Sequence, residues 1–458
     1  MAIKERDAGA IGGRDLTRGS LHRAIWYLAP AMTLETGIMN VAQLLDTYWV
    51  GQLGSAALAA VTISITIRWV LNSLANGLGI GGLAVVARRV GARDAEEAAH
   101  AAWQTILLGA AVSVVLGVAG LAAARPLLVL LGADAQVLPL GLAYLRVAFG
   151  GLFTLVLVFA INALLRGAGD ARWAMWVLAL STGMTVVLEP VLIFGWGPVP
   201  ALGVAGSAWA FVLGFGAGLA LQLTVLLGGH SRLRLQLSDL RIDLPLMARI
   251  VRIALPSTVQ MTLRSSSRLA IVGLVGLYGT FATAGYGVAN RLLLIALIPC
   301  FGLGNAAGTL VGQNLGARQP DRAERSAWWV AAYSGIYMAA AATILTFFGP
   351  SLVAFFDPTP EVVAMGTEAV QVVAFSMIAS SVGVVLGRGF DGAGNTVPAM
   401  AINLLTLWAL EVPMAFGLSR WLGLGISGVW WGRAAANLAN GLLFAGWFLR
   451  GKWKEREV

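Results

Sequence analysis

The sequence predicts an all-α membrane protein with many spanning helices. Of its 458 residues, 58% are apolar and only 12% are charged, whereas charged residues make up roughly 25% of a typical soluble protein. The mean hydropathy is +0.80 over the whole length, and the 57 glycines suit helices that pack closely in lipid. The alternating pattern of membrane β-strands is absent from the sequence, so a β-barrel is not expected.

Twelve apolar stretches are long enough to cross a bilayer, which takes about 20 residues. The polar, charged residues before the first stretch lack the apolar core of a cleavable secretory signal, so we expect this span to be retained. The predicted spans are residues 24–50, 56–87, 99–124, 137–165, 173–196, 203–228, 247–275, 281–313, 327–348, 362–387, 397–419 and 424–449.

Basic residues are distributed unevenly between the predicted loops. If the N-terminus is cytoplasmic, most of the 31 Lys and Arg residues lie in the tails and the inner loops, whereas the outer loops hold Arg125 and Arg420. This positive-inside asymmetry predicts a protein of the inner membrane with both termini in the cytoplasm. It also accounts for the net charge of +9 without a nucleic-acid partner. The single cysteine, Cys300, excludes an intramolecular disulfide.

The two halves of the chain are related by an internal repeat. Three glycine motifs recur 225 residues later, and the match then resumes at an offset of 222 with Glu189 against Glu411. Six spans in each repeat give both halves the same orientation. The recurring motifs are Gly51-x-x-Gly54 with Gly276-x-x-Gly279, Gly91-Ala92-Arg93 with Gly316-Ala317-Arg318, and Gly167-Ala168-Gly169 with Gly392-Ala393-Gly394. The predicted organisation is a tail (1–23), a six-helix lobe (24–228), a cytoplasmic linker (229–246), a second lobe (247–449) and a tail (450–458).

The repeated motifs are also typical of helix ends. We expect Gly91 and Gly316 to be the left-handed residues that end a helix. Asp170 and Asn395, which follow the third motif in the two repeats, are both favoured at helix N-caps.

The sequence shows no catalytic or nucleotide-binding motif. G-x-x-x-x-G-K-[ST] is absent and the three lysines lie at the chain ends, which excludes an ATPase. Neither H-E-x-x-H nor G-x-S-x-G occurs, and His22, His100 and His230 fall at predicted membrane boundaries. We therefore expect no enzyme activity, no cofactor and no structural metal.

Four acidic residues lie within predicted spans: Glu35, Asp46, Glu189 and Glu411. An ionisable residue in the membrane faces protein or water and usually marks a transport path. Asp46 and Glu189 each fall late in a span that runs outward, so they can meet in the outer half of the first lobe. Repulsion between two carboxylates away from water favours binding of a proton or a sodium ion. The alternative is structural pairing with an intramembrane arginine such as Arg68 or Arg146.

The first span carries a polar stripe. Thr36, Asn40, Gln43 and Asp46 follow at helical spacing, and such a stripe requires water or a ligand. Glu35 lies three turns before Asp46 and so near the same face. It can line a cavity or form a buried ion pair. Pro30 interrupts the same helix and permits a hinge.

Together these residues resemble the multidrug and toxic compound extrusion (MATE) transporters over nearly the whole chain. The resemblance implies twelve helices in two lobes arranged as a V, and export of mostly organic cations in exchange for protons or sodium. Its carriers are Pro30, Leu45-Asp46-Thr47-Tyr48-Trp49-Val50-Gly51-Gln52-Leu53-Gly54, Arg88-Arg89-Val90-Gly91-Ala92-Arg93-Asp94, Arg166-Gly167-Ala168-Gly169-Asp170, Leu188-Glu189-Pro190 and Leu202-Gly203-Val204-Ala205-Gly206.

Within that family, Asp46 and Glu189 match the acids of the DinF-like branch, whose N-terminal lobe carries the coupling site. Thr185 stands where that branch often has asparagine, and Asn162 and Ser207 are available as neutral ligands. Because threonine is a weaker cation ligand than an amide carbonyl, we expect coupling to protons, with sodium at Asp46 and Glu189 as the alternative.

The seventh span lacks the acid found there in other branches. It has Gln260, Arg264, Ser267 and Arg268 instead, on one helix face. If that face lines the cavity, it favours a substrate with an anionic group; the alternative is an ion pair with Glu35 or Glu411. The predicted substrate cavity consists of Glu35, Thr36, Asn40, Gln43, Gln260, Arg264, Arg268 and Glu411.

The leading hypothesis is a monomeric antiporter that exports drug-like organic cations or zwitterions by alternating access, with lipid as its surroundings. A flippase or exporter of a lipid-linked or anionic metabolite is the second hypothesis. The twelve spans disfavour it, and the intramembrane arginines favour it. A channel or a membrane scaffold is disfavoured by two homologous lobes with opposed acids. The intramembrane arginines are Arg68, Arg146, Arg264, Arg268, Arg291 and Arg433.

Overall fold

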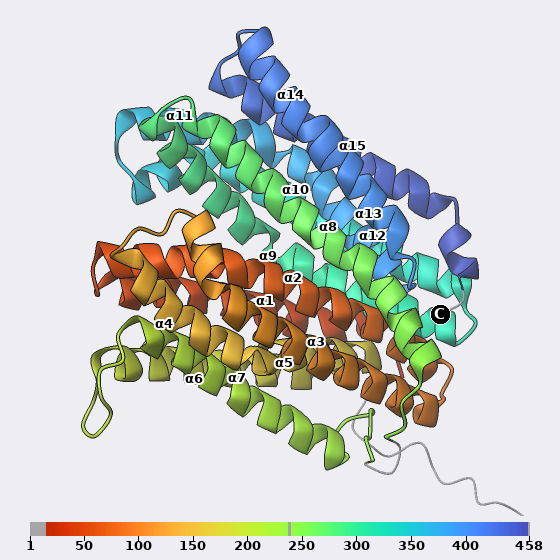
Figure 1. Cartoon of the computed structure of the whole chain (residues 1–458). Coiled ribbons are helices and arrows are strands. Elements are labelled where there is room, and N and C mark those ends of the chain that lie inside the picture. Colours follow the sequence, from red (N-terminus) through yellow and green to blue (C-terminus); the bar gives the residue numbers. More distant parts are fainter. Residues whose placement is uncertain (1–14, 237–239, 457–458) are drawn as a thin grey trace, which may run out of the picture. The chain divides into compact units, whose positions relative to one another are not determined.

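The computed structural model describes residues 15–236 and 240–456, and the regular secondary structure of this part of the chain is helical, apart from one isolated bridge between Trp196 and Val199 (Figure 1). This confirms the all-α prediction. Residues 1–14 of the predicted N-terminal tail, 237–239 of the predicted linker and 457–458 of the predicted C-terminal tail lie outside the described residues.

The helices follow one another with short connections. The first half contains α1 (Leu21–Gly51), α2 (Ser55–Gly91), α3 (Ala95–Leu130), α4 (Val137–Gly150), α5 (Leu152–Ala168), α6 (Ala171–Phe194) and α7 (Val204–Leu227). The second half contains α8 (Leu244–Gly276), α9 (Thr280–Gly316), α10 (Pro320–Phe356), α11 (Pro360–Ala374), α12 (Ser376–Gly392), α13 (Thr396–Asn403), the π-helical η2 (Leu404–Glu411), α14 (Val412–Phe416), the π-helical η3 (Gly417–Trp421), α15 (Ile426–Leu449) and the 3₁₀ turn η4 (Lys452–Glu455).

The described helices provide the twelve predicted spans. Seven segments are long and apolar enough to cross a membrane, and two bent helix pairs, α4 with α5 and α11 with α12, meet the same criteria when each is taken together. α1, α8 and α15 have 31, 33 and 24 residues, a spanning length with a more polar composition. The π-helical segments lie within the eleventh span, between Thr396 and Trp421.

Two predicted spans are bent rather than straight. The chain turns by 50° between α4 and α5 and by 55° between α11 and α12. At each bend a hydroxyl donates to the backbone carbonyl three residues earlier, Thr154 to Gly151 over 2.8 Å and Ser376 to Val373 over 2.6 Å. A side chain that bonds back to the helix in this way competes with the backbone ladder, which permits a bend where the neighbouring helices allow one.

The described chain forms two compact units. The first comprises the residues up to Gly19 and Gly37–Val251, and the second comprises Ser20–Thr36 and Arg252–Val458. These units differ from the predicted lobes at the starts of α1 and α8, each of which runs from one unit into the other. In the first unit α6 packs on α7 and α2 on α5; in the second, α9 packs on α10, α11 and α12, and α12 on α15.

Glycines allow close approach between the equivalent helix pairs α2–α5 and α9–α12. A Cβ atom added to Gly392 would lie 1.9 Å from the carbonyl oxygen of Gly308, whereas one added to the repeat-equivalent Gly167 would lie 3.0 Å from that of Leu83. The core of the second unit beside these helices contains Cys300, which is completely buried.

The ends of α2 and α9 correct one sequence prediction. Gly91 and Gly316 are the last helical residues and not the left-handed ones; the left-handed residues are Arg93 (φ 62°) and Arg318 (φ 57°). The helix continues through Gly91, and the reversal at Arg93 lets the N–H of Asp94 reach the carbonyl of Arg89 over 3.0 Å.

The predicted N-cap residues stand at helix starts without capping them. Asp170 precedes α6 and Asn395 precedes α13, and neither side chain makes a cap hydrogen bond. The buried carboxylate of Asp170 instead accepts hydrogen bonds from the Ser231 hydroxyl (2.5 Å) and the Arg232 N–H (2.8 Å), which fasten the linker to the first unit.

Candidate functional site

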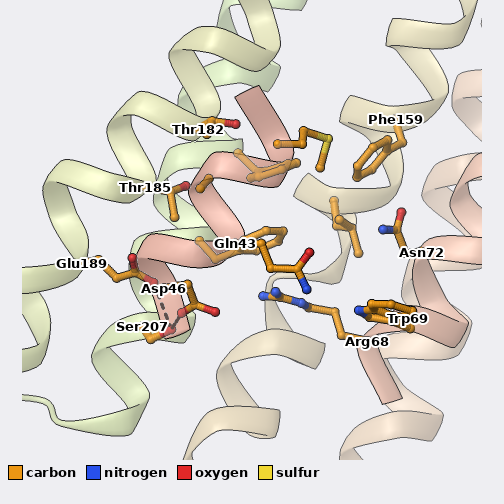
Figure 2. Close-up of a pocket in the computed structure, with 15 residues that line it drawn as sticks. Gln43, Asp46, Arg68, Trp69, Asn72, Phe159, Thr182, Thr185, Glu189 and Ser207 are labelled. Atoms are coloured by element: carbon orange, nitrogen blue, oxygen red, sulfur yellow. Dashed lines mark hydrogen bonds between the residues drawn. The ribbon is translucent and has the colours of Figure 1, made fainter. Parts of the chain in front are cut away.

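A pocket of about 110 Å³ lies within the first unit, between α1, α2, α5, α6 and α7 (Figure 2). Its walls combine aromatic rings with a few polar and charged groups, a composition common in sites for organic ligands. The lining residues are Met39, Ala42, Gln43, Asp46, Arg68, Trp69, Asn72, Leu155, Phe159, Thr182, Thr185, Glu189, Ser207, Phe211 and Phe215.

The structure brings Asp46 of α1 and Glu189 of α6 together on Ser207 of α7 (Figure 2). All three side chains are buried. The Ser207 hydroxyl lies 2.9 Å from Oδ1 of Asp46 and 3.4 Å from Oε1 of Glu189. A hydroxyl has one proton to donate, so it can serve only one carboxylate at a time.

The second oxygen of each carboxylate has no hydrogen-bond donor among the described residues. Oδ2 of Asp46 and Oε2 of Glu189 are buried and make no hydrogen bond within the described residues. Buried acceptors are normally paired, and two carboxylates that interact with each other repel when both are ionised. A proton or a small cation shared by the pair would satisfy these oxygens.

Arg68 of α2 supplies a fixed positive charge in the same pocket. Its Nη1 donates to the hydroxyl of the fully buried Tyr144 over 2.8 Å, and its guanidinium carbon lies 4.4 Å from the centre of the Phe211 ring. It acts electrostatically on Glu189. Between Arg68 and either acid of the pocket, however, the described residues form no salt bridge within 4.0 Å. Arg146, the other arginine considered as a partner, is exposed on α4.

The predicted neutral ligands separate into two groups. Ser207 and Thr185 line the pocket, and the Thr185 hydroxyl donates to the carbonyl of Ser181 over 2.8 Å. Asn162 is not a lining residue. Its side chain donates to the carbonyl of Ala174 (3.1 Å) and accepts from Gln222 (2.8 Å), so it joins helices beside the pocket.

The predicted polar stripe of α1 is divided between the two units. Glu35 and Thr36 belong to the second unit, whereas Asn40, Gln43 and Asp46 belong to the first. Only Gln43 and Asp46 of this stripe line the pocket. Glu35 is buried, and the Thr36 hydroxyl donates to the carbonyl of Met32 over 3.0 Å.

Pro30 lies inside α1, which is helical from Leu21 to Gly51. Its role as a hinge stays a prediction.

The remaining predicted cavity residues lie in the second unit. Arg264, Arg268 and the half-buried Gln260 are on α8, and the buried Glu411 is the last residue of η2. Glu411 interacts electrostatically with Arg433 of α15 and with Arg268 and Arg264. These charges form a second cluster.

Several residues of these sites were missed as site residues by sequence reasoning. Arg68 was considered there only as a structural partner of the acids, and Arg433 only as one of the intramembrane arginines. Tyr144 and Phe211 carried no signal of their own. Arginine within a span was the available clue, because such a charge needs a partner in the protein.

Comparison with known proteins identifies the family. The MatE family model matches residues 31–191 and 256–416. The chain is 27% identical over 450 residues to the probable multidrug resistance protein YoeA of Bacillus subtilis, with 96% of each protein covered. It is 25% identical to the probable multidrug resistance protein NorM of Thermotoga maritima, covering 92% of this chain and 91% of the relative. It is also 27% identical to the FAD transporter of Shewanella oneidensis, covering 83% and 84%.

Solved structures agree with this result. A crystal structure of MATE in the bent conformation aligns with a TM-score of 0.90 at 25% identity, covering 96% of this chain and 97% of that one. A transporter from Pyrococcus furiosus, described as having a binding pocket of reversed polarity, shares the fold with a TM-score of 0.89 at 24% identity, covering 96% and 98%. The two matches of the family model fall on the two sequence repeats, and the relatives span nearly the whole chain. The chain therefore belongs to the MatE family of multidrug and toxic compound extrusion transporters, which are multi-pass membrane proteins.

Proposed function

We propose that this transporter is a proton-coupled antiporter of the DinF-like branch, in which Asp46 and Glu189 bind the driving proton. The observation that carries the proposal is the position of Ser207 between the two carboxylates, at 2.9 and 3.4 Å. One hydroxyl proton cannot serve both acids, and a proton on Glu189 would let this acid donate to Ser207 while Ser207 donates to Asp46.

Two features favour a proton over sodium. Hard cations prefer a shell of several oxygen ligands, but the amide oxygen of Asn162 already accepts a hydrogen bond from Gln222 and does not line the pocket. The fixed guanidinium of Arg68 also disfavours a second compact cation in the pocket. A single proton leaves the pocket with one carboxylate, one carboxylic acid and one arginine, which is electrically neutral.

Release of that proton would give the pocket a net negative charge and prepare it for an organic cation. The aromatic side chains of Trp69, Phe159 and Phe215 provide apolar surface for such a compound. Protonation from the outside would then remove the attraction and release the compound. We further propose that the protein acts as a monomer in the inner membrane with both termini in the cytoplasm, as the positive-inside asymmetry indicates.

The test is efflux of a fluorescent organic cation from proteoliposomes under an imposed gradient. Asp46→Asn and Glu189→Gln should each reduce pH-driven efflux to the level of protein-free liposomes, because neither variant can cycle a proton between two acids. Glu368→Gln, which removes a half-buried carboxyl group from α11 outside the pocket, is the matched control and should transport normally.

Sodium-driven efflux at constant pH would overturn proton coupling, and full pH-driven activity in Asp46→Asn would remove this residue from the mechanism. Flux that does not saturate with substrate would instead indicate a channel.

Export of an anionic metabolite is the second candidate function. The arginines of the second unit favour it, and one relative is named as an FAD transporter. Equal gradient-driven export of FAD and of the cationic dye would support this broader substrate range; export of the dye alone would reject it.

A further inference from the structure

The charged cluster of the second unit occupies the positions that correspond, in the repeat, to the pocket of the first unit. Four residues that line the first pocket have charged counterparts at the offsets of 225 or 222 residues established by the repeat. The pairs are Met39 with Arg264, Gln43 with Arg268, Glu189 with Glu411 and Phe211 with Arg433. The second unit therefore has its own version of this site, with added positive charge.

Two residues of the carboxylate site in the first pocket, Asp46 and Ser207, have apolar counterparts in this second site. At the position equivalent to Asp46 the second unit has Ile271, and at that of Ser207 it has Val429. Both side chains are buried in the apolar core of that unit. Glu411 has consequently lost its carboxylate partner and interacts with three arginines instead.

The arginines are held by neutral groups. Arg433 donates to the Tyr286 hydroxyl (3.4 Å) and to Oδ1 of Asn290 (3.2 Å), and its guanidinium lies 5.9 Å from the centre of the Tyr286 ring. Arg264 donates to Oδ1 of Asn403 over 3.3 Å. These bonds orient the guanidinium groups without neutralising them.

The remaining scaffold of the site is polar but uncharged. Asn440 donates to Asn403 (3.4 Å) and to the hydroxyl of Thr406 (2.9 Å), which fixes the amide that receives Arg264. The neighbouring Arg388 is paired with Asp391 over 3.2 Å, so this pair adds no net charge.

The cluster as a whole has three guanidinium groups and one carboxylate. An excess of positive charge within a span is costly unless an anion compensates it. Arginine presents paired donors that match a carboxylate or a phosphate group. From the repeat equivalence and the charge excess, we infer that Arg264, Arg268 and Arg433 bind an anionic group, a carboxylate or a phosphate, of the exported compound. This inference deepens the proposed function, since it assumes that the protein exports organic compounds.

Rhodamine B and its ethyl ester test the inference, because they differ only in that the first carries a free carboxylate. Binding is measured by fluorescence anisotropy on the full-length protein in phosphatidylcholine nanodiscs without any gradient, with empty discs subtracted. The native protein should bind rhodamine B more tightly than the ester. Arg268→Gln and Arg433→Gln should each reduce this preference about tenfold, the effect of losing one charge-assisted hydrogen bond.

Two further variants separate binding from a structural role. Arg291→Gln removes an exposed arginine from α9 of the same unit and should leave the preference unchanged. Glu411→Gln removes the competing carboxylate and should increase the preference for rhodamine B, which a purely structural ion pair would not do. Arg433→Lys keeps the charge and replaces Arg433→Gln if the latter does not fold; it should retain part of the preference.

Equal binding of the two dyes by the native protein would overturn the inference, as would an unchanged preference in both Arg268→Gln and Arg433→Gln. The same measurement is made with phosphatidylglycerol in place of part of the lipid, and empty discs are again subtracted. If the native protein then loses its preference for rhodamine B, the site belongs to a lipid headgroup and the inference is overturned. Asp46→Asn should retain a preference for rhodamine B over the ester while failing in pH-driven efflux, so a failure of the anion site and a failure of proton coupling give different results.

Discussion

Replacing Gly392 by alanine should destabilise the second unit strongly. The added methyl carbon would lie 1.9 Å from the carbonyl oxygen of Gly308 and 2.6 Å from its carbonyl carbon, and both atoms belong to the backbone of α9. Neither can rotate away as a side chain could. The two helices α9 and α12 therefore have to separate to admit the methyl group.

The size of the effect follows from that separation. Moving the contact from 1.9 Å to an ordinary distance displaces the helices by on the order of 1 Å, enough to disturb a close-packed interface. Overpacking costs about 1–3 kcal/mol and sometimes more, so we expect Gly392→Ala to reach about 3 kcal/mol. At Gly167, where the equivalent contact is 3.0 Å, the strain should nearly cancel the gain of roughly 0.5–1 kcal/mol from replacing a helical glycine.

Thermal unfolding of the detergent-solubilised protein, followed by tryptophan fluorescence, measures the difference. The apparent Tm should fall clearly in Gly392→Ala, change little in Gly167→Ala, and stay level or rise in Gly287→Ala, where nothing lies within 4 Å of the added carbon. Equal apparent Tm values for Gly392→Ala and Gly167→Ala would refute the reasoning from close approach.

Three further outcomes are expected. Arg68→Gln should lower pH-driven efflux by about tenfold, because the pocket loses its fixed charge and a charge-assisted bond. Tyr144→Phe removes only the 2.8 Å hydrogen bond and should have a smaller effect. The reverse order in the same efflux assay would contradict this expectation. Asp243 caps α8 through the Leu246 N–H (2.9 Å), and this bond, followed by His100, holds the pKa of the Asp243 carboxyl below its usual 3.8. The stabilisation from the ionised Asp243 is present above pH 3.8 and is lost as the pH falls through the lowered pKa. Asp243→Ala should therefore reduce the apparent Tm at pH 7 but not in strong acid. Asp243→Asn keeps the cap acceptor and should reduce the apparent Tm less. Burial raises the pKa of the Asp170 carboxyl, so the stability contributed by its protonated form is complete below the usual pKa of 3.8 and is lost as the pH rises through the raised value. Asp170→Asn should therefore raise the apparent Tm at pH 7 more than at pH 4. A larger gain in Tm at pH 4 would show that the sign is wrong.

The span positions could be predicted because apolar length is a local property of the sequence. The two bends could not. Thr154 and Ser376 bond back to the carbonyl three residues earlier at the bends, but Ser113 and Ser326 make the same bond within the unbroken α3 and α10. The local signal is therefore the same, and the difference lies in how neighbouring helices pack around the bond.

The candidate site shows a similar division. The depth of Asp46 and Glu189 in their spans was enough to expect them to meet, because depth follows from counting residues along a helix. The position of Asn162 outside the pocket could not be expected, because a sequence does not show which side of α5 faces the pocket. The contacts of Arg68 on α2 with Tyr144 on α4 and Phe211 on α7 also depend on the packing of three helices. The sequence of any one of these helices does not predict them.

The burial of Cys300 has a practical consequence for studies of movement. As the only cysteine of the chain, and one enclosed in the core of the second unit, it should not react with thiol reagents while that core is closed. Spectroscopic labels can therefore be attached to cysteines introduced at exposed positions such as Leu130 and Phe355, which are 81% and 82% exposed and lie in different compact units. A pair of labels in an otherwise native chain can then report the distance between the two units during transport.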